Sequence, residues 1–311
     1  MSEEKSVYVG IDVAKKTLEV ATSPEGLRLS LPNTPQGHRK LVAELKKLDV
    51  AKVVMEASGG YERTLSADLL DAGYDAVVED PRRIRHFAKG MGKVAKTDRI
   101  DAAVIARYAE VVRPERSKIK ADADLAALVG RRSQLVDMIR DEKNRLDTAG
   151  QRAVQKSLRE GITWMKRQVA KLEREIAARI KADDDMSRKD KILQSVPGIK
   201  DKTSAMLLSR LPELGTLNRQ EVAALVGVAP YDAQSGQWRG KSRIWGGRAD
   251  VRRALYMPAL AARRCNEKIR RFAQRLEKAG KPHKVILVAC MRKLLVILNT
   301  MLRTNTTWQS A

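Results

Sequence analysis

The first 115 or so residues alternate between two hydrophobic patterns, one of period two and one of helical spacing. Short runs in which every second residue is apolar predict strands, and the segments between them carry apolar residues three or four positions apart. The predicted strands are 7–12, 18–22, 27–31, 52–57 and 75–78, and the predicted helices are 37–48 and 61–72.

This order of elements predicts a mixed sheet. Pro24, Glu25 and Gly26 form a turn between the second and third strands, so the first three strands should pair as an antiparallel meander. The later strands, which follow helices, should pair in parallel. The arrangement matches a ribonuclease-H-like domain, although other mixed sheets share the order. A loop over 89–96 leads to a helix from Thr97.

Residues 121–182 have a helical pattern without proline. Within it, apolar residues repeat at alternating spacings of three and four, as a coiled coil requires. They are Ile162, Met165, Val169, Leu172 and Ile176. Either a coiled coil between chains or a helical hairpin within one chain would explain this seam. The chain thus divides into an α/β domain (1–118), a helical coiled-coil dimerisation arm (119–188) and a mainly helical domain (189–311).

Charge decides what kind of partner to expect. The 311 residues include 61 Lys and Arg against 38 Asp and Glu, a net charge of +23, which favours a polyanion. No segment is expected to span a membrane, and the N-terminus lacks the pattern of a signal peptide, so a cytoplasmic location is expected. Cys265 and Cys290 are then free thiols. With three histidines in the chain, carboxylates are the most plentiful candidate metal ligands.

Two of those carboxylates end predicted strands. Alternation places Asp12 on the opposite face of its strand from Val9 and Ile11, and Glu56 ends the fourth strand in a similar way. If the two strands are neighbours, both carboxylates lie at one edge of the sheet, where a cation would relieve their repulsion. Taken singly, each would be an ordinary solvated strand end.

Asp98 and Asp101 are three residues apart and therefore lie on one face of the helix that starts near Thr97. Capping and the helix dipole also favour aspartate in a first turn, so this pair alone has a structural explanation. Together, the four carboxylates provide the hard oxygen ligands that Mg²⁺ or Mn²⁺ prefers. Two such ions can stabilise both the entering and the leaving oxygen of a phosphodiester transfer.

Three segments resemble the motifs of one family. Val9 to Lys15, Met55 to Tyr61 and Lys96 to Ala102 are similar to the motifs of the DEDD transposases of bacterial insertion sequences, and the resemblance covers nearly the whole chain. It implies a RuvC-like domain, exchange of strands between donor and target DNA, a divalent metal, a bridge RNA as guide, and a dimer or tetramer. Ser195 to Ile199 resembles the helix-hairpin-helix-like start of the family's C-terminal domain, with Lys200 or Asp201 in place of its second glycine.

The resemblance also assigns a nucleophile. In the family a Ser-Gly pair carries the reactive serine, and Ser235 is the residue that matches, in a segment that reads as a loop. Without that context a Ser-Gly pair would be read as a turn. A serine hydroxyl needs activation, and family precedent places the metal beside it, with the carboxylates contributed by the same or another subunit.

Basic residues interleaved with aromatic ones surround Ser235 and suit phosphate contacts with base stacking, although a solvated basic loop is the alternative. The predicted nucleic-acid-binding residues are Arg82, Arg83, Lys96, Trp238, Arg239, Lys241, Arg243 and Arg248. The sequence thus predicts a bacterial, cytoplasmic DNA transposase with Asp12, Glu56, Asp98, Asp101 and Ser235 as catalytic residues. A junction-resolving nuclease that uses water, or a binding scaffold without catalysis, are the alternatives.

Overall fold

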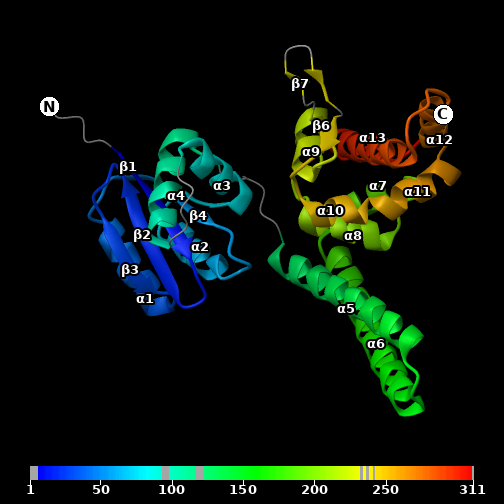
Figure 1. Cartoon of the computed structure of the whole chain (residues 1–311), viewed down its shortest axis with the longest axis horizontal. Coiled ribbons are helices and arrows are strands. Elements are labelled where there is room, and N and C mark those ends of the chain that lie inside the picture. Colours follow the sequence, from blue (N-terminus) through cyan, green and yellow to red (C-terminus); the bar gives the residue numbers. More distant parts are fainter. Residues whose placement is uncertain are drawn as a thin grey trace. The chain divides into compact units, whose positions relative to one another are not determined.

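A computed structural model describes residues 6–92, 98–115, 122–231, 234–235, 238–240 and 242–309 (Figure 1). For 98–100, 234–235 and 238–239 it describes the backbone. The contacts within the chain separate it into two compact units, residues 1–118 and 119–311. Each unit is described by itself.

The first unit contains a five-stranded sheet in the order β3-β2-β1-β4-β5. β1 pairs antiparallel with β2 and parallel with β4, β2 pairs antiparallel with β3, and β4 pairs parallel with β5. The bounds are β1 (Val7–Val13), β2 (Thr17–Ser23), β3 (Arg28–Pro32), β4 (Val50–Glu56) and β5 (Ala76–Glu79). The predicted order of strands and helices is confirmed, and the mixed sheet is compatible with a ribonuclease-H-like domain.

Helices cover both faces of this sheet. α1 (Pro35–Leu45) and α2 (Glu62–Asp71) bury Leu41 and Leu65 against one face, together with Val9 and Ile11 of β1. α3 (Pro81–Gly90) and α4 (Asp98–Val112) pack on the other face, where Ile105 joins a cluster with strand residues. Because both faces are covered, polar side chains of the central strands are confined to the strand ends.

One helix was not predicted. Arg82 and Arg83, with the loop proposed to begin at residue 89, fall in α3, which runs to Gly90. Asp80 caps it by accepting a bond from the Arg82 amide, and Pro81 occupies the first turn. The helix is short and carries few apolar residues, with Ile84 as its buried residue, so the hydrophobic pattern was too weak to detect it.

The arm in the second unit is a hairpin of α5 (Ala123–Thr148) and α6 (Arg152–Ala182). Ile162 and Met165 of the predicted seam are buried against Leu135 of α5, and Ile176 is buried near Leu125. The seam therefore packs within the chain, which is the hairpin alternative. A dimerisation role for the arm stays a prediction and would use other residues.

In the described part of this unit, seven further helices and a small ribbon follow the arm. They are α7 (Asp184–Gln194), α8 (Asp201–Arg210), α9 (Arg219–Val226), α10 (Ala249–Ala254), α11 (Tyr256–Cys265), α12 (Glu267–Lys278) and α13 (His283–Thr304). α13 is long and apolar enough to cross a membrane, contrary to the sequence expectation. Eight of its residues belong to the hydrophobic core of the unit, however, which accounts for its composition.

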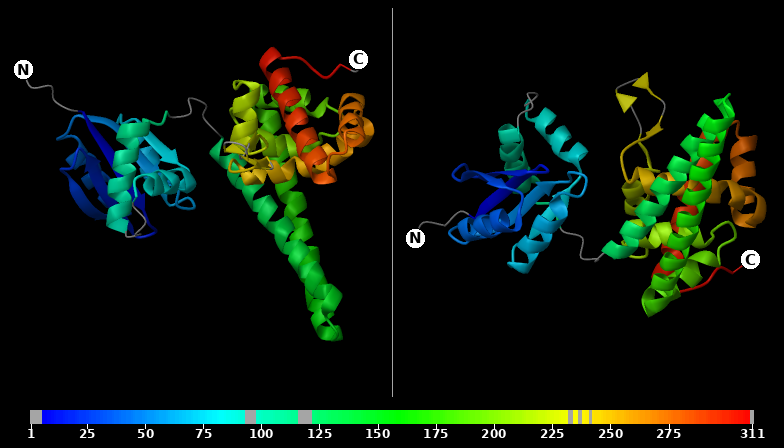
Figure 2. Two further views of the ribbon diagram at one scale, coloured as in Figure 1. Left: turned by 45° about the horizontal axis from the view of Figure 1, so that its top comes forward. Right: turned by 90° about the horizontal axis from the view of Figure 1, so that it is seen from below.

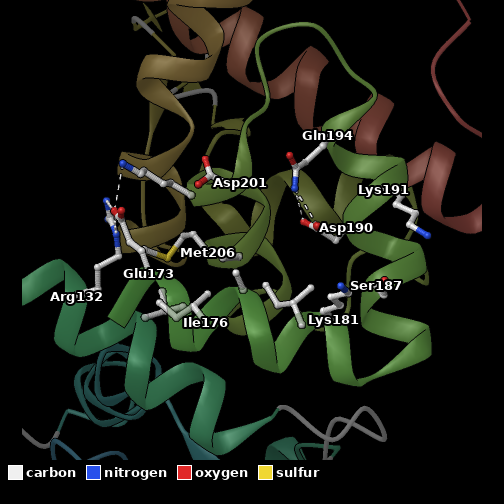
Figure 3. A pocket seen from close by; sticks show the side chains of 15 residues that line it. Arg132, Glu173, Ile176, Lys181, Ser187, Asp190, Lys191, Gln194, Asp201 and Met206 are labelled. Carbon is white, nitrogen blue, oxygen red and sulfur yellow. Dashed lines mark hydrogen bonds and ion pairs between the residues drawn. The ribbon is translucent and has the colours of Figure 1, made fainter. Parts of the chain in front are cut away.

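A cavity of about 330 Å³ lies where the arm meets α7 and α8 (Figure 3). Arg132 and Lys202 both contact Glu173 on its wall, at 2.8 and 3.1 Å, so these charges join the arm to α8. Asp190 is held by the Gln194 amide. None of the predicted site residues lines this cavity.

Candidate active site

Asp12 and Glu56 lie side by side at the carboxyl ends of two neighbouring strands. β1 and β4 are parallel and adjacent, with Ile11 beside Met55 in the register, and each acidic residue follows directly. Both are half-buried. The sequence analysis required the two strands to be neighbours for these carboxylates to lie at one edge, and the structure confirms that they are.

The start of α4 lies near the carboxyl end of β1. A Cβ atom on Gly10 of β1 would lie 2.1 Å from the Ala106 amide nitrogen and 2.3 Å from the Ala102 carbonyl oxygen, so glycine lets α4 cross the strand at close range. The Arg113 guanidinium lies over the Tyr8 ring, 5.6 Å from its centre. The end of α4 is thus near the start of β1, and its first turn lies over the end of β1.

That first turn carries the other two predicted ligands. Asp98 is the first residue of α4 and Asp101 is half-buried within it. The Asp98 side chain lies outside the described part of the chain. Three separate elements therefore bring carboxylate-bearing positions to one end of the sheet.

Two further acids, which the sequence patterns did not reveal, stand in line with this pair. Glu19 of β2 is the register partner of Asp12, and Glu79 of β5 is the register partner of Glu56. Partners in register point to the same face. Four acids therefore form a row across four strands, with Asp12 and Glu56 at its centre. Their positions at strand ends are visible in the sequence, but the register that aligns them is not.

The outer acids are held by protein donors. Glu79 is buried and accepts bonds from the Tyr108 hydroxyl at 2.8 Å and from the Arg83 guanidinium at 3.0 Å. Burial, together with this bond to a carboxylate, raises the pKa of Tyr108. Glu19 accepts a bond from the Ser30 hydroxyl at 2.6 Å. Each outer acid thus has a structural role that needs no metal.

Carboxylate-bearing positions of β1, β4 and α4 lie at one strand edge, and carboxylate oxygens are the ligands that a hard divalent cation prefers. Among the side chains that the structure describes, no group of three or more Asp, Glu, His or Cys could hold an ion. Asp12, Glu56 and Asp101 are among these described side chains and do not form such a group by themselves, and the side chain of the fourth predicted ligand, Asp98, lies outside the described part of the chain. A groove of about 280 Å³ lies beside the row, lined by residues that include Glu19, Arg28, Ser30 and Ala102.

Ser235 lies in a two-stranded ribbon rather than in the loop that was predicted. β6 (Pro230–Tyr231) pairs with β9 (Arg243–Ile244), and farther out β7 (Gln234–Ser235) pairs with β8 (Trp238–Arg239). Ser235 is the register partner of Trp238. The ribbon extends away from α9 and α10 (Figures 1 and 2). Strands of two residues, mostly polar, leave no hydrophobic pattern to read.

The base of the ribbon is closely packed around glycines. Gly227 and Gly247 have φ angles of +74° and +65°, which favour glycine. A Cβ on Gly247 would lie 2.3 Å from the Gly227 amide nitrogen, so the two backbones touch. Arg252 donates to the carbonyl oxygen of Gly246 at 2.7 Å and to those of Val226 and Gly227 at 3.3 Å. The direction in which the ribbon leaves the unit is fixed here.

Arg248 strengthens the same base. Its guanidinium makes two bonds of 2.6 Å to the Glu213 carboxylate and one of 2.9 Å to the Arg210 carbonyl oxygen. Burial raises the pKa of Glu213, but the bonds and charge of Arg248 outweigh that effect and lower it. Arg248 was predicted to bind nucleic acid, and in the structure its donors serve the fold.

Gly247→Ala is expected to destabilise this base, and Gly246→Ala supplies a matched control. Both glycines have left-handed φ angles, +65° and +68°, so alanine costs about 1–2 kcal/mol at either position. A Cβ on Gly247 also meets backbone at 2.3 Å, whereas one on Gly246 meets nothing within 4 Å. Urea denaturation should show a loss larger for Gly247→Ala by roughly 1–3 kcal/mol. Equal losses would contradict the close packing.

The other predicted contact residues have varied settings. Arg82 and Arg83 of α3 and Arg243 of β9 are all exposed. Arg82 forms an ion pair with Asp80 at 3.9 Å, and Arg83 forms one with Glu79 at 3.0 Å. Trp238 and Arg239 are described by their backbone in β8. Lys96 and Lys241 lie outside the described residues. Their contacts with nucleic acid stay predictions.

The predicted helix-hairpin-helix-like start consists of α7, a turn and α8. Gly198 in the turn has a φ angle of +105°, and a Cβ there would lie 3.0 Å from the Ala262 amide nitrogen. The Ser195 hydroxyl accepts a bond from the Trp308 amide at 2.8 Å. The turn is therefore packed against α11 and held by the C-terminal segment.

Comparison with known proteins agrees with this picture. A model described as a transposase, for the DEDD type of IS110 elements, matches residues 9–151, and the model of the transposase IS116/IS110/IS902 family matches residues 190–274. Pilin gene-inverting proteins of Moraxella bovis and Moraxella lacunata are each 27% identical over 310 residues, which is 96% of this chain and of each relative. An uncharacterized 43.6 kDa protein of insertion element IS110 from Streptomyces coelicolor is 30% identical over 122 residues, 38% of this chain and 30% of that protein.

Proposed function

The chain belongs to the IS110 family of DNA transposases, and from this premise we propose that it exchanges DNA strands through Ser235, with a divalent metal at Asp12, Glu56, Asp98 and Asp101. The observation that carries the proposal is the meeting of β1, β4 and the first turn of α4 at one strand edge. Relatives named for inverting a pilin gene support it, because inversion requires strands to be cut and rejoined.

In this proposal Ser235 carries out the covalent step. Its Oγ forms a bond to the phosphorus of a DNA phosphodiester as the bond from phosphorus to one sugar oxygen breaks. The serine proton is lost and the departing sugar oxygen gains one, so the protons balance. The hydroxyl end of another strand then attacks the phosphoserine and releases Ser235. The number of phosphoester bonds is unchanged, and no external energy source is needed.

The four carboxylates would hold Mg²⁺ or Mn²⁺, which stabilises negative charge on the phosphate when bound. The residues of this chain supply the rest. Asp12 and Glu56 lie on two adjacent parallel strands, so the backbone positions that carry them are fixed relative to each other. The ribbon holds Ser235 away from the helices of its own unit, which suits a serine that acts on DNA bound at a carboxylate site of the same or another subunit.

Bridge RNA as the guide, and assembly into a dimer or tetramer, complete the proposal. The net charge of +23 is consistent with contacts to the phosphates of both DNA and RNA. Since chromosomal DNA is the substrate, the enzyme would act in the bacterial cytoplasm.

Strand exchange between two labelled duplexes, with protein purified at low salt, tests this function. Each duplex carries a different dye, so joining produces a strand with both dyes and hydrolysis produces shortened strands with one. We expect joined strands in Mg²⁺ and their loss after the preparation is treated with ribonuclease. Shortened strands alone would favour a nuclease that uses water. Joining that survives ribonuclease would remove the guide RNA from the proposal.

A further inference from the structure

Positive charge is concentrated in the second unit. Residues 119–311 contain 40 basic and 20 acidic side chains, against 21 and 18 in residues 1–118. Within the second unit, residues 262–285, which include α12, contain nine basic and two acidic side chains. This segment contains none of the residues predicted to bind nucleic acid.

The two acids of the segment are already paired. Glu267 forms ion pairs with Arg270 and Arg271, and Glu277 forms one with Arg263. The other six basic side chains of 262–285 form no ion pair with any residue that the structure describes. Their charge is therefore directed to solvent or to a partner.

Four of the basic residues follow one side of α12. Lys268, Arg271, Arg275 and Lys278 are spaced three, four and three residues apart, and all are exposed. Arg271 is paired with Glu267, and the other three belong to the six without an ion pair. At 1.5 Å per residue these positions extend over about 15 Å. We call them the α12 stripe. The opposite side of the helix is buried in the core through residues such as Ile269.

Aromatic rings hold two of these cations in place. The Lys268 ammonium lies over the Trp308 ring at 5.0 Å, and the Arg275 guanidinium lies over the Phe272 ring at 5.3 Å. The Asn266 side chain caps the helix by accepting a bond from the Ile269 amide. Fixed cations lose less side-chain entropy when a ligand binds than mobile ones do.

We infer that the α12 stripe binds the phosphate backbone of duplex DNA. One strand of a duplex carries a phosphate every 3.4 Å or so along the axis, so about 15 Å covers roughly four phosphates. DNA is the substrate of the family, and the stripe belongs to the unit that carries Ser235. Packing links the two: α10 follows the ribbon and contacts α11, which contacts α12.

Neither a membrane surface nor plain solvation accounts as well for the α12 stripe. A membrane-binding helix would need a free apolar side, and that side of α12 is already buried in the core. An ordinary solvated helix carries both signs in comparable numbers, as α5 does with five basic and five acidic residues. The rings beside the stripe lie beneath its cations, which suits contacts with backbone phosphates better than stacking of unpaired bases.

The test replaces Lys268, Arg271, Arg275 and Lys278 with glutamine. Affinity for a 40-bp duplex is measured against salt concentration by fluorescence anisotropy, with EDTA present so that no cleavage is involved. The slope of log affinity against log salt should become shallower by about three to four, since each phosphate contact contributes about 0.9. The outcome is independent of whether Ser235 is the nucleophile.

The matched control removes four charges from α6 through Arg159, Arg167, Lys171 and Arg174, all exposed, and should change the slope much less. If the fourfold variant does not fold, the double variant Arg275→Gln/Lys278→Gln replaces it and should change the slope by about half as much. An unchanged slope in a folded variant, or an equal change in the α6 control, would overturn the inference. An equal change of slope with a structured RNA of similar length would also overturn it, because the surface would then not be specific to DNA.

Discussion

Ser235→Ala is expected to abolish DNA joining and to leave DNA binding unchanged. The substitution removes one hydroxyl from β7 and none of the surrounding charge. If Ser235 attacks the phosphodiester, the alanine variant lacks the oxygen that forms the covalent intermediate. Wild-type protein should therefore form a protein–DNA adduct on a nicked suicide substrate, resistant to denaturant and sensitive to protease. Peptide mass should place the phosphate on Ser235.

Ser242→Ala is the matched control, because Ser242 is a second serine of the same ribbon segment. It should form the adduct as the wild type does. DNA occupancy is measured in parallel, so that a binding defect cannot be mistaken for a chemical one. An alanine variant at 235 that still cuts DNA near the wild-type rate would show that water attacks, and the nucleophile assignment would be wrong.

The elements that could be predicted are those with a strong hydrophobic pattern of their own. β1 alternates around Val9 and Ile11, and the heptad of α6 repeats over several turns. Patterns of this kind indicate which residues are buried, but they do not indicate which element or chain packs against those residues. The seam at Ile162 and Met165 was equally consistent with two chains or one, and the answer came from Leu135 on the facing helix.

The features that could not be predicted depend on contacts between distant segments. Strand register aligns Glu19 with Asp12, and no local pattern contains that information. α3 is short, and its few apolar residues become buried because they pack beside α4. The local sequence does not contain that contact. The ribbon is held by close contact between Gly227 and Gly247 rather than by hydrophobic strands. The candidate site residues could be named from local motifs, whereas their arrangement in space could not.

Asp12→Asn, Glu56→Gln, Asp98→Asn and Asp101→Asn are each expected to reduce DNA joining by roughly 100-fold or more. An amide has nearly the same size as a carboxylate but no negative charge, so metal binding weakens while packing is retained. Losing several kcal/mol of charge stabilisation in the transition state corresponds to a factor of this size. Rates would be measured against Mg²⁺ concentration, with circular dichroism as the check on folding.

Glu19→Gln distinguishes a metal site from a general need for acidic residues in the row. Glu19 stands in register with Asp12 and has the same charge, but its carboxylate is bonded to Ser30 and it is not one of the proposed ligands. We expect Glu19→Gln to join DNA within a few-fold of the wild type and to keep its dependence on Mg²⁺. Asp12→Asn, one strand away, should need far more Mg²⁺ or fail at any concentration. If both substitutions reduced joining equally, the acidic row would act through its total charge, and the assignment of four specific ligands would have to be abandoned.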